Sequence, residues 1–137
     1  MHFTVNYLAV VVAAVAAWIL GALWYSPALF ARQWMAAHNY SPERIEAMKK
    51  GMAKTYAISF LCFVVMAGVL AILVDRLGIL GALGGVKLGA ITWLGFAATI
   101  GLTANLYSDK PLAAFLIDAG YQLVYMVVMG VILAVWK

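Results

Sequence analysis

The chain contains little charge and a single cysteine. Only 10% of its 137 residues are charged, whereas an average soluble protein has about 25%. The lone Cys62 excludes an internal disulfide framework, a zinc ribbon and a CxxC redox motif. Apolar residues make up 67% of the chain, which excludes disorder and exceeds what one soluble core of this size can bury. The composition therefore predicts an integral membrane protein.

Long segments of the chain have no charged residue, and they predict the membrane spans. The longest of them cover residues 1–31, 55–74, 88–108 and 119–136. A helix needs about 20 apolar residues to cross the hydrocarbon core of a bilayer. We therefore expect an all-α fold, an integral membrane four-helix transmembrane bundle that forms one domain over residues 1–137. Its spans are expected at about residues 5–25, 56–74, 88–107 and 112–136, and the glycine-rich segment 77–86 is expected to form a turn between two of them.

Lys and Arg are distributed unevenly between the loops. Six of the nine lie in the loop after the first span or in the turn after the third. The positive-inside rule predicts that these two loops are cytoplasmic and that both termini face outward, in a multi-pass protein of the inner (cytoplasmic) membrane. This distribution accounts for the net charge of +4, so the expected partner is the lipid bilayer and not nucleic acid. No Lys or Arg precedes the first span, which we interpret as a retained helix rather than a signal peptide.

The first loop contains signals for helices. The sequence Ser-Pro-Glu at residues 41–43 supplies an N-cap, a proline at the first helical position and an acid in the first turn. It predicts a short helix over about residues 42–50. Before it, Phe30, Trp34 and Met35 are spaced like one face of a short amphipathic helix at the membrane interface. We interpret this loop as a surface connection anchored by aromatic residues, with partner docking as the alternative.

Polar residues inside a membrane are costly, so their positions are informative. In the fourth span they follow the spacing i, i+3, i+4, i+7 of one helical face: Asp118, Tyr121, Gln122 and Tyr125. In the third span, Thr99, Thr103 and Asn105 are expected at a similar depth. We expect Asp118 or Gln122 to hydrogen-bond with one of these three residues, in a polar half-cavity open to the first-loop side. Two roles remain open for Asp118: a structural clamp between helices, or a site for a proton or cation.

Aromatic residues mark the predicted helix ends: Trp24, Tyr25, Tyr56, Tyr107 and Trp136. Because Trp and Tyr are enriched at membrane–water interfaces, we expect them to form an aromatic belt. The first span is expected to break at Ser26, because Pro27 disfavours a helical conformation there. The chain contains no P-loop, GxSxG, HExxH or carboxylate dyad. We therefore expect no catalytic residues, no metal site and no cofactor, and a protein that is not an enzyme.

Two motifs carry a resemblance to a known family. The first comprises Trp24, Tyr25, Ser26 and Pro27, followed by Phe30 and Trp34. The second combines Asn105 and Tyr107 at a helix end with the segment 115–121. Together they resemble the bacterial integral membrane family called "domain of unknown function 1761", over nearly the whole chain. The resemblance implies a small four-helix membrane protein and implies no activity.

Three functions are compatible with these features. The first is a homo-oligomeric transporter or channel for a small cation or polar solute, with any pore between subunits because four helices enclose little space. The second is an accessory or scaffolding subunit that has a partner in a larger membrane complex. The third is a lipid- or quinone-binding module that uses the same polar half-cavity.

Overall fold

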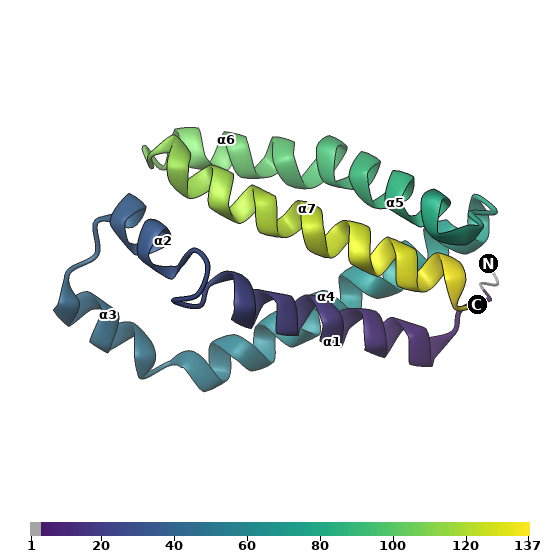
Figure 1. Ribbon diagram of the computed structural model, residues 1–137, viewed down its shortest axis with the longest axis horizontal. Coiled ribbons are helices and arrows are strands. Elements are labelled where there is room, and N and C mark those ends of the chain that lie inside the picture. The colour runs from purple at the N-terminus through teal and green to yellow at the C-terminus, as the bar shows by residue number, and fades with distance from the viewer. Residues whose placement is uncertain (1–3) are drawn as a thin grey trace.

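The computed structural model describes residues 4–137, and every regular element in that range is a helix (Figure 1). The elements are α1 (Tyr7–Trp24), α2 (Ala31–His38), α3 (Pro42–Lys49), α4 (Met52–Arg76), α5 (Gly81–Thr92), the π-helix η1 (Trp93–Ala98), α6 (Thr99–Tyr107) and α7 (Leu112–Val135). Four helices are long and apolar enough to cross a membrane: α1, α4, α7 and the continuous helix Gly81–Tyr107 formed by α5, η1 and α6. The expected all-α fold with four membrane helices is confirmed.

Helix α7 is central to the bundle, because it contacts α1, α4 and α5. Figure 1 shows the start of α1 and the end of α7 at one end of the molecule. Helices α2 and α3 and the turn between α6 and α7 lie at the opposite end. The first loop and the turn after the third membrane helix therefore share one end of the bundle, as the sequence predicted.

The helix starts follow local capping chemistry. The side chain of Asn6 accepts a hydrogen bond of 3.1 Å from the backbone N–H of Ala9 at the start of α1. The hydroxyl of Ser41 accepts one of 3.1 Å from the backbone N–H of Arg44 at the start of α3. Each cap satisfies a backbone donor that has no partner within the helix. The short helix predicted in the first loop is thus confirmed, with its expected cap.

The third membrane helix begins about two turns earlier than the sequence predicted. It starts at Gly81 rather than near residue 88, so the expected turn over 77–86 is wrong for its second half. A Cβ on Gly85 would lie 2.6 Å from the carbonyl carbon of Gly130. A Cβ on Gly89 would lie 2.5 Å from the carbonyl oxygen of Met126. These two glycines therefore serve the close approach of α5 to the backbone of α7, which small residues permit in membrane helices.

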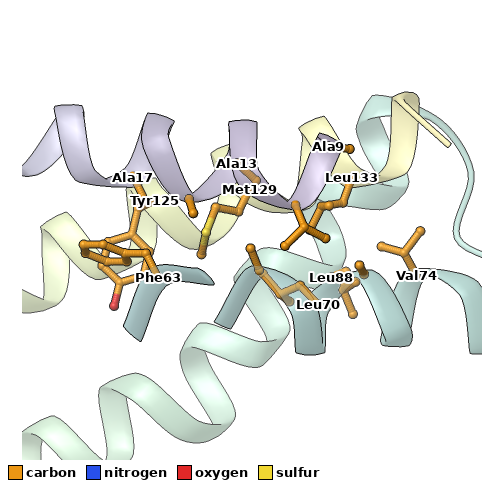
Figure 2. Close-up of a cluster of buried hydrophobic side chains, with 14 of the residues drawn as sticks. Ala9, Ala13, Ala17, Phe63, Leu70, Val74, Leu88, Tyr125, Met129 and Leu133 are labelled. Atoms are coloured by element: carbon orange, nitrogen blue, oxygen red, sulfur yellow. The ribbon is translucent and has the colours of Figure 1, made fainter. Parts of the chain in front are cut away.

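The core lies toward the end of the bundle where α1 begins, and its side chains come from α1, α4, α5 and α7 (Figure 2). Helix α1 contributes a row of fully buried alanines, Ala9, Ala13 and Ala17. Met129 of α7 is also fully buried and lies below this row, with Leu70 of α4 nearby (Figure 2). Apolar side chains thus fill this half of the bundle, while leucine, isoleucine and valine side chains on the outside are exposed, as contact with lipid requires.

The contact between α5 and α7 predicts a specific sensitivity to added volume. Replacing Gly85 with alanine should lower the free energy of unfolding by about 2–3 kcal/mol, because the new methyl group meets backbone atoms that cannot move aside. Gly68 of α4 is the matched control, since nothing lies within 4 Å of the methyl group that Gly68→Ala adds. That variant should be as stable as the wild type or more stable. Unfolding in mixed detergent–SDS micelles, followed by circular dichroism, measures both. Equal stability of the two variants would contradict the close backbone contact.

Candidate functional site

The chain turns back on itself where α1 ends. The hydroxyl of Ser26 donates a 2.6 Å hydrogen bond to the carbonyl of Leu23, and the N–H of Phe30 donates one of 3.0 Å to the carbonyl of Trp24. Pro27 lies inside this turn, so the predicted break of the first span at Ser26 agrees with the structure. The turn directs α2 toward the start of α7, which α2 contacts.

Trp24 and Phe30 anchor this turn on α7. The indole N–H of Trp24 donates a 3.0 Å hydrogen bond to the carbonyl of Ile117. The ring of Phe30 packs on the indole, with 4.8 Å between ring centroids. Gly120 makes room for the indole, since a Cβ there would lie 3.2 Å from a ring carbon of Trp24. The first family motif thus binds the end of α1 to the second turn of α7.

Asp118 is the point where three segments meet. The hydroxyl of Tyr25 donates a 2.5 Å hydrogen bond to Asp118 Oδ1, and the indole N–H of Trp34 donates one of 3.1 Å to the same oxygen. These donors come from the end of α1 and from α2. Among the described residues, no hydrogen bond reaches the other carboxylate oxygen, Oδ2. Asp118 therefore clamps the first loop to α7 through a single carboxylate oxygen.

The two tyrosines of the predicted polar face point elsewhere. Tyr121 is buried and donates a 2.6 Å hydrogen bond to the carbonyl of Ala17 in α1. Tyr125 is buried against Phe63 of α4, and its hydroxyl lies 3.8 Å from the sulfur of Met66. Both tyrosines are thus packing residues between α1, α4 and α7, and the polar face of the sequence divides into two parts.

A pocket of about 180 Å³ lies beside Asp118, between α2, α6 and α7. Its lining comprises His38, Gly101, Ala104, Asn105, Ser108, Lys110, Ala114, Phe115, Asp118, Ala119 and Gln122. Ser108 and Lys110 belong to the turn between α6 and α7, so they lie at the first-loop end. Gln122 lies one turn further along α7 than Asp118, and its Oε1 is 4.0 Å from the position of a Cβ on Gly101. The pocket is therefore polar on several sides and reaches into the membrane helices.

The expected hydrogen bond from Asp118 or Gln122 to the third span is wrong for all three candidates. Thr99 and Thr103 are exposed, and their hydroxyls donate to carbonyls of their own helix. Asn105 is buried, but its side-chain amide donates a 3.2 Å hydrogen bond to the carbonyl of Pro111 and closes the α6–α7 turn. A threonine hydroxyl can donate its hydrogen bond to a backbone carbonyl of its own helix. The Asp118 carboxylate accepts instead from donors at the end of α1 and in the first loop. Asn105 still lines the pocket with Asp118 and Gln122.

The aromatic residues separate into two groups. Trp24 and Tyr25 are half-buried and donate hydrogen bonds to α7, so they make contacts within the protein that the belt interpretation did not include. Tyr56 and Tyr107 are exposed, the latter by 90%, and so is Trp136; for these three the belt remains a prediction. Trp34 points inward to Asp118 rather than toward an interface.

Two site residues have roles that the sequence did not indicate. Trp93, the first residue of η1, donates a 2.9 Å hydrogen bond from its indole to the carbonyl of Ala119. His38 packs between Trp34 and Tyr40, with ring-centroid distances of 4.3 and 5.1 Å. Its Nε2 is buried and has no hydrogen-bond partner among the described residues. A single histidine at the end of a loop helix carries no periodic signal, so only the folded chain reveals this neighbourhood.

Burial lowers the pKa of His38 below its ordinary value of 6.5. The ammonium of Lys110 lowers this pKa further, while the carboxylate of Asp118 opposes the shift. At pH 7 the imidazole is therefore uncharged. The three groups interact across the same pocket.

A model of the family described as "Protein of unknown function (DUF1761)" matches residues 8–134 of the chain. The match contains all four membrane helices almost completely, together with the Trp24–Trp34 motif and the pocket. No curated protein and no solved structure matches the chain significantly.

The clamp predicts a coupled effect of two substitutions. Tyr25→Phe keeps the ring but removes the donor to Asp118, and should lower the free energy of unfolding by about 1 kcal/mol. In an Asp118→Ala background the same change should have little effect, because the acceptor is already gone. Tyr56→Phe, at an exposed tyrosine, is the control. Unfolding in mixed micelles measures the cycle. An equal loss in both backgrounds would show that the tyrosine hydroxyl acts through another partner.

The lowered pKa of His38 predicts that the packing of α2 against the bundle is less stable at acidic pH. Because its folded pKa is lowered, its contribution to stability is complete above pH 6.5 and is lost as the pH falls below that value. Amide hydrogen exchange over residues 31–38 should therefore accelerate as the pH falls below about 6.5, after correction for the intrinsic rate. His38→Gln, which cannot gain a proton, should remove this acceleration. The same acceleration in His38→Gln would assign the pH dependence to a different group.

Proposed function

The chain belongs to the family described as protein of unknown function (DUF1761), and we propose that it is a subunit of a homo-oligomeric transporter that binds a small cation or polar solute beside Asp118. One observation carries this proposal. Tyr25 and Trp34 hold one oxygen of the Asp118 carboxylate, while the other oxygen has no partner among the described residues and the side chain lines a polar pocket. A residue needed only as a clamp does not require such a pocket.

The chemistry of the pocket suits a positively charged group. A cation inside a membrane is stable only where a negative or strongly polar group faces it. Asp118 supplies the carboxylate, and Gln122 supplies an amide oxygen on the same wall of the pocket.

Access to the pocket is from one side. The lining residues of the α6–α7 turn lie at the first-loop end, and apolar side chains fill the opposite half of the bundle. The positive-inside rule favours a cytoplasmic location for this mouth, in an inner membrane. A single subunit thus holds a solute from one side, and passage across the membrane requires a second copy or a rearrangement of helices. This requirement favours a homo-oligomer, which binds and moves its solute without catalysing a reaction.

An accessory role in a larger membrane complex is the second candidate, and α3 favours it. This helix has its own cap and a charged surface, yet it has no extensive contact with the other helices of the described chain. Its residues are exposed except Ile45 and Met48, which are half-buried. The intact mass of the protein, extracted gently from its own membrane, separates the candidates. A defined homo-oligomer supports the transporter, and a fixed ratio with another protein supports the accessory subunit.

The transporter predicts a flux that depends on the carboxylate. Purified protein is reconstituted into vesicles that contain a pH-sensitive dye, and proton entry is driven by a potassium diffusion potential, with and without methylammonium outside. The wild type should conduct protons or methylammonium. Asp118→Asn keeps an oxygen for Tyr25 and Trp34 but loses the charge, and should lower the flux at least about tenfold. Asp118→Leu loses both the clamp and the charge and should be inactive.

The control for this experiment is Asp109→Asn. Asp109 lies outside the pocket lining, and its backbone has a left-handed conformation, with φ of 53°, that asparagine also accepts. This variant removes a carboxylate from the same end of the protein and should keep the wild-type flux. If neither Asp118 variant changes the flux of either probe, the carboxylate has no part in transport.

A further inference from the structure

We propose that the ligand of the Asp118 pocket is a compact zwitterion that carries a primary ammonium and a phosphate, the chemistry of an ethanolamine phospholipid headgroup. The inference rests on the proposed function for the location of the site and names the chemical class of ligand that the site holds. It follows from the two opposite charges, Asp118 and Lys110, that line one pocket of about 180 Å³. A simple cation would use only one of them.

The ammonium end is placed at the inner part of the pocket. A primary ammonium donates up to three hydrogen bonds and accepts none. Asp118 Oδ2 has no hydrogen-bond partner among the described residues. The side-chain oxygen of Gln122 lies one helical turn further in and also faces the pocket, near Gly101. These two oxygens offer acceptors to an ammonium, and the charge of the carboxylate offsets the charge of the ligand.

The phosphate end is placed at the mouth. The side chain of Lys110 lines the pocket and forms no ion pair among the described residues, and the hydroxyl of Ser108 lies on the same turn. His38 also lines the pocket, but its Nε2 is buried and is not a donor to a ligand there. A phosphate would thus give Lys110 a counter-charge.

The position of the pocket favours a lipid as the source of this headgroup. Part of its lining lies where α6 ends and α7 begins, and the end of a helix that crosses a bilayer is expected at the level of the headgroups. Leucines of the same two helices are exposed to the surroundings: Leu102, Leu106, Leu112 and Leu116. Acyl chains attached to a headgroup in the pocket would continue along such apolar surface. A soluble phosphate monoester of an amino alcohol has the same recognition chemistry without this apolar contact.

The proposal predicts a ranking of lipids. An ethanolamine headgroup has both the N–H donors and the phosphate. A choline headgroup has the same charges but no N–H, so it cannot hydrogen-bond to Asp118 or Gln122. A glycerol headgroup has the phosphate but no cation, so the carboxylate would be left without a counter-charge. Ethanolamine lipid should therefore bind at least about tenfold more tightly than either of the others.

Native mass spectrometry of the full-length, delipidated protein tests this ranking. The protein is titrated with an equimolar mixture of dioleoyl phosphatidylethanolamine, phosphatidylcholine and phosphatidylglycerol, and the bound lipids are counted. Lys110→Gln and Asp118→Asn should each remove the preference for ethanolamine lipid. Both variants are expected to fold, because Lys110 is exposed and an asparagine oxygen still accepts from Tyr25 and Trp34. Lys54→Gln, a lysine at the same end but outside the pocket, should keep the preference.

Each outcome has a defined meaning. Equal retention of the three lipids together with no binding of soluble phosphoethanolamine, or a preference for the glycerol lipid, overturns the zwitterion site. A preference that survives in both pocket variants overturns its location. Soluble phosphoethanolamine is added as the second arm: displacement of the lipid supports one shared site, and binding without any lipid preference supports the zwitterion with a soluble source. If the lipid preference holds while the Asp118 variants leave the flux unchanged, the transporter proposal is wrong and the binding site is supported. If the flux depends on Asp118 but no zwitterion preference is found, the transporter proposal is supported and the zwitterion site is wrong.

Discussion

The hydrogen bonds to Asp118 connect the parts of this protein that sequence distance separates. A carboxylate in a membrane helix needs donors or a cation, because water cannot supply them there. Tyr25 and Trp34 bring those donors from the end of α1 and from α2. To reach the carboxylate, the chain must turn sharply after α1, and Trp24, Phe30 and Gly120 make that turn fit against α7. The clamp thereby builds one wall of the pocket.

A second constraint closes the other half of the bundle. Gly85 and Gly89 let α5 approach the backbone of α7, and the buried alanines of α1 do the same on another side. Close backbone packing supplies dispersion contacts where lipid removes the hydrophobic advantage of helix association. Among the described residues, the side chains buried in this core are apolar apart from the hydroxyls of Tyr121 and Tyr125. The pocket with polar lining lies instead at the first-loop end, between residues of α2, α6 and α7.

One residue combines two roles that sequence reasoning treats as alternatives. As a clamp, Asp118 accepts hydrogen bonds through Oδ1; as a candidate ligand group, its side chain lines the pocket. Because both roles share a carboxylate, the charge that attracts a ligand also strengthens the bonds from Tyr25 and Trp34. Substitutions at this position must therefore separate charge from hydrogen bonding, which asparagine and leucine do in opposite ways.

Composition and periodicity by themselves determined the membrane class, four helices, the helix in the first loop and the face that carries Asp118 and Gln122. These features depend on local chemistry: uncharged length, capping residues and 3.6-residue spacing. The tertiary structure alone decided which groups meet. Thr99 and Thr103 hydrogen-bond to their own helix, whereas Trp34 and His38 of α2 lie against Asp118 and its pocket. The role of the glycines within residues 81–89 was also decided by the tertiary structure, because glycine is equally suited to a turn and to close helix packing. Only the position of a second helix, α7, distinguishes these two uses, and sequence spacing carries no information about that distance.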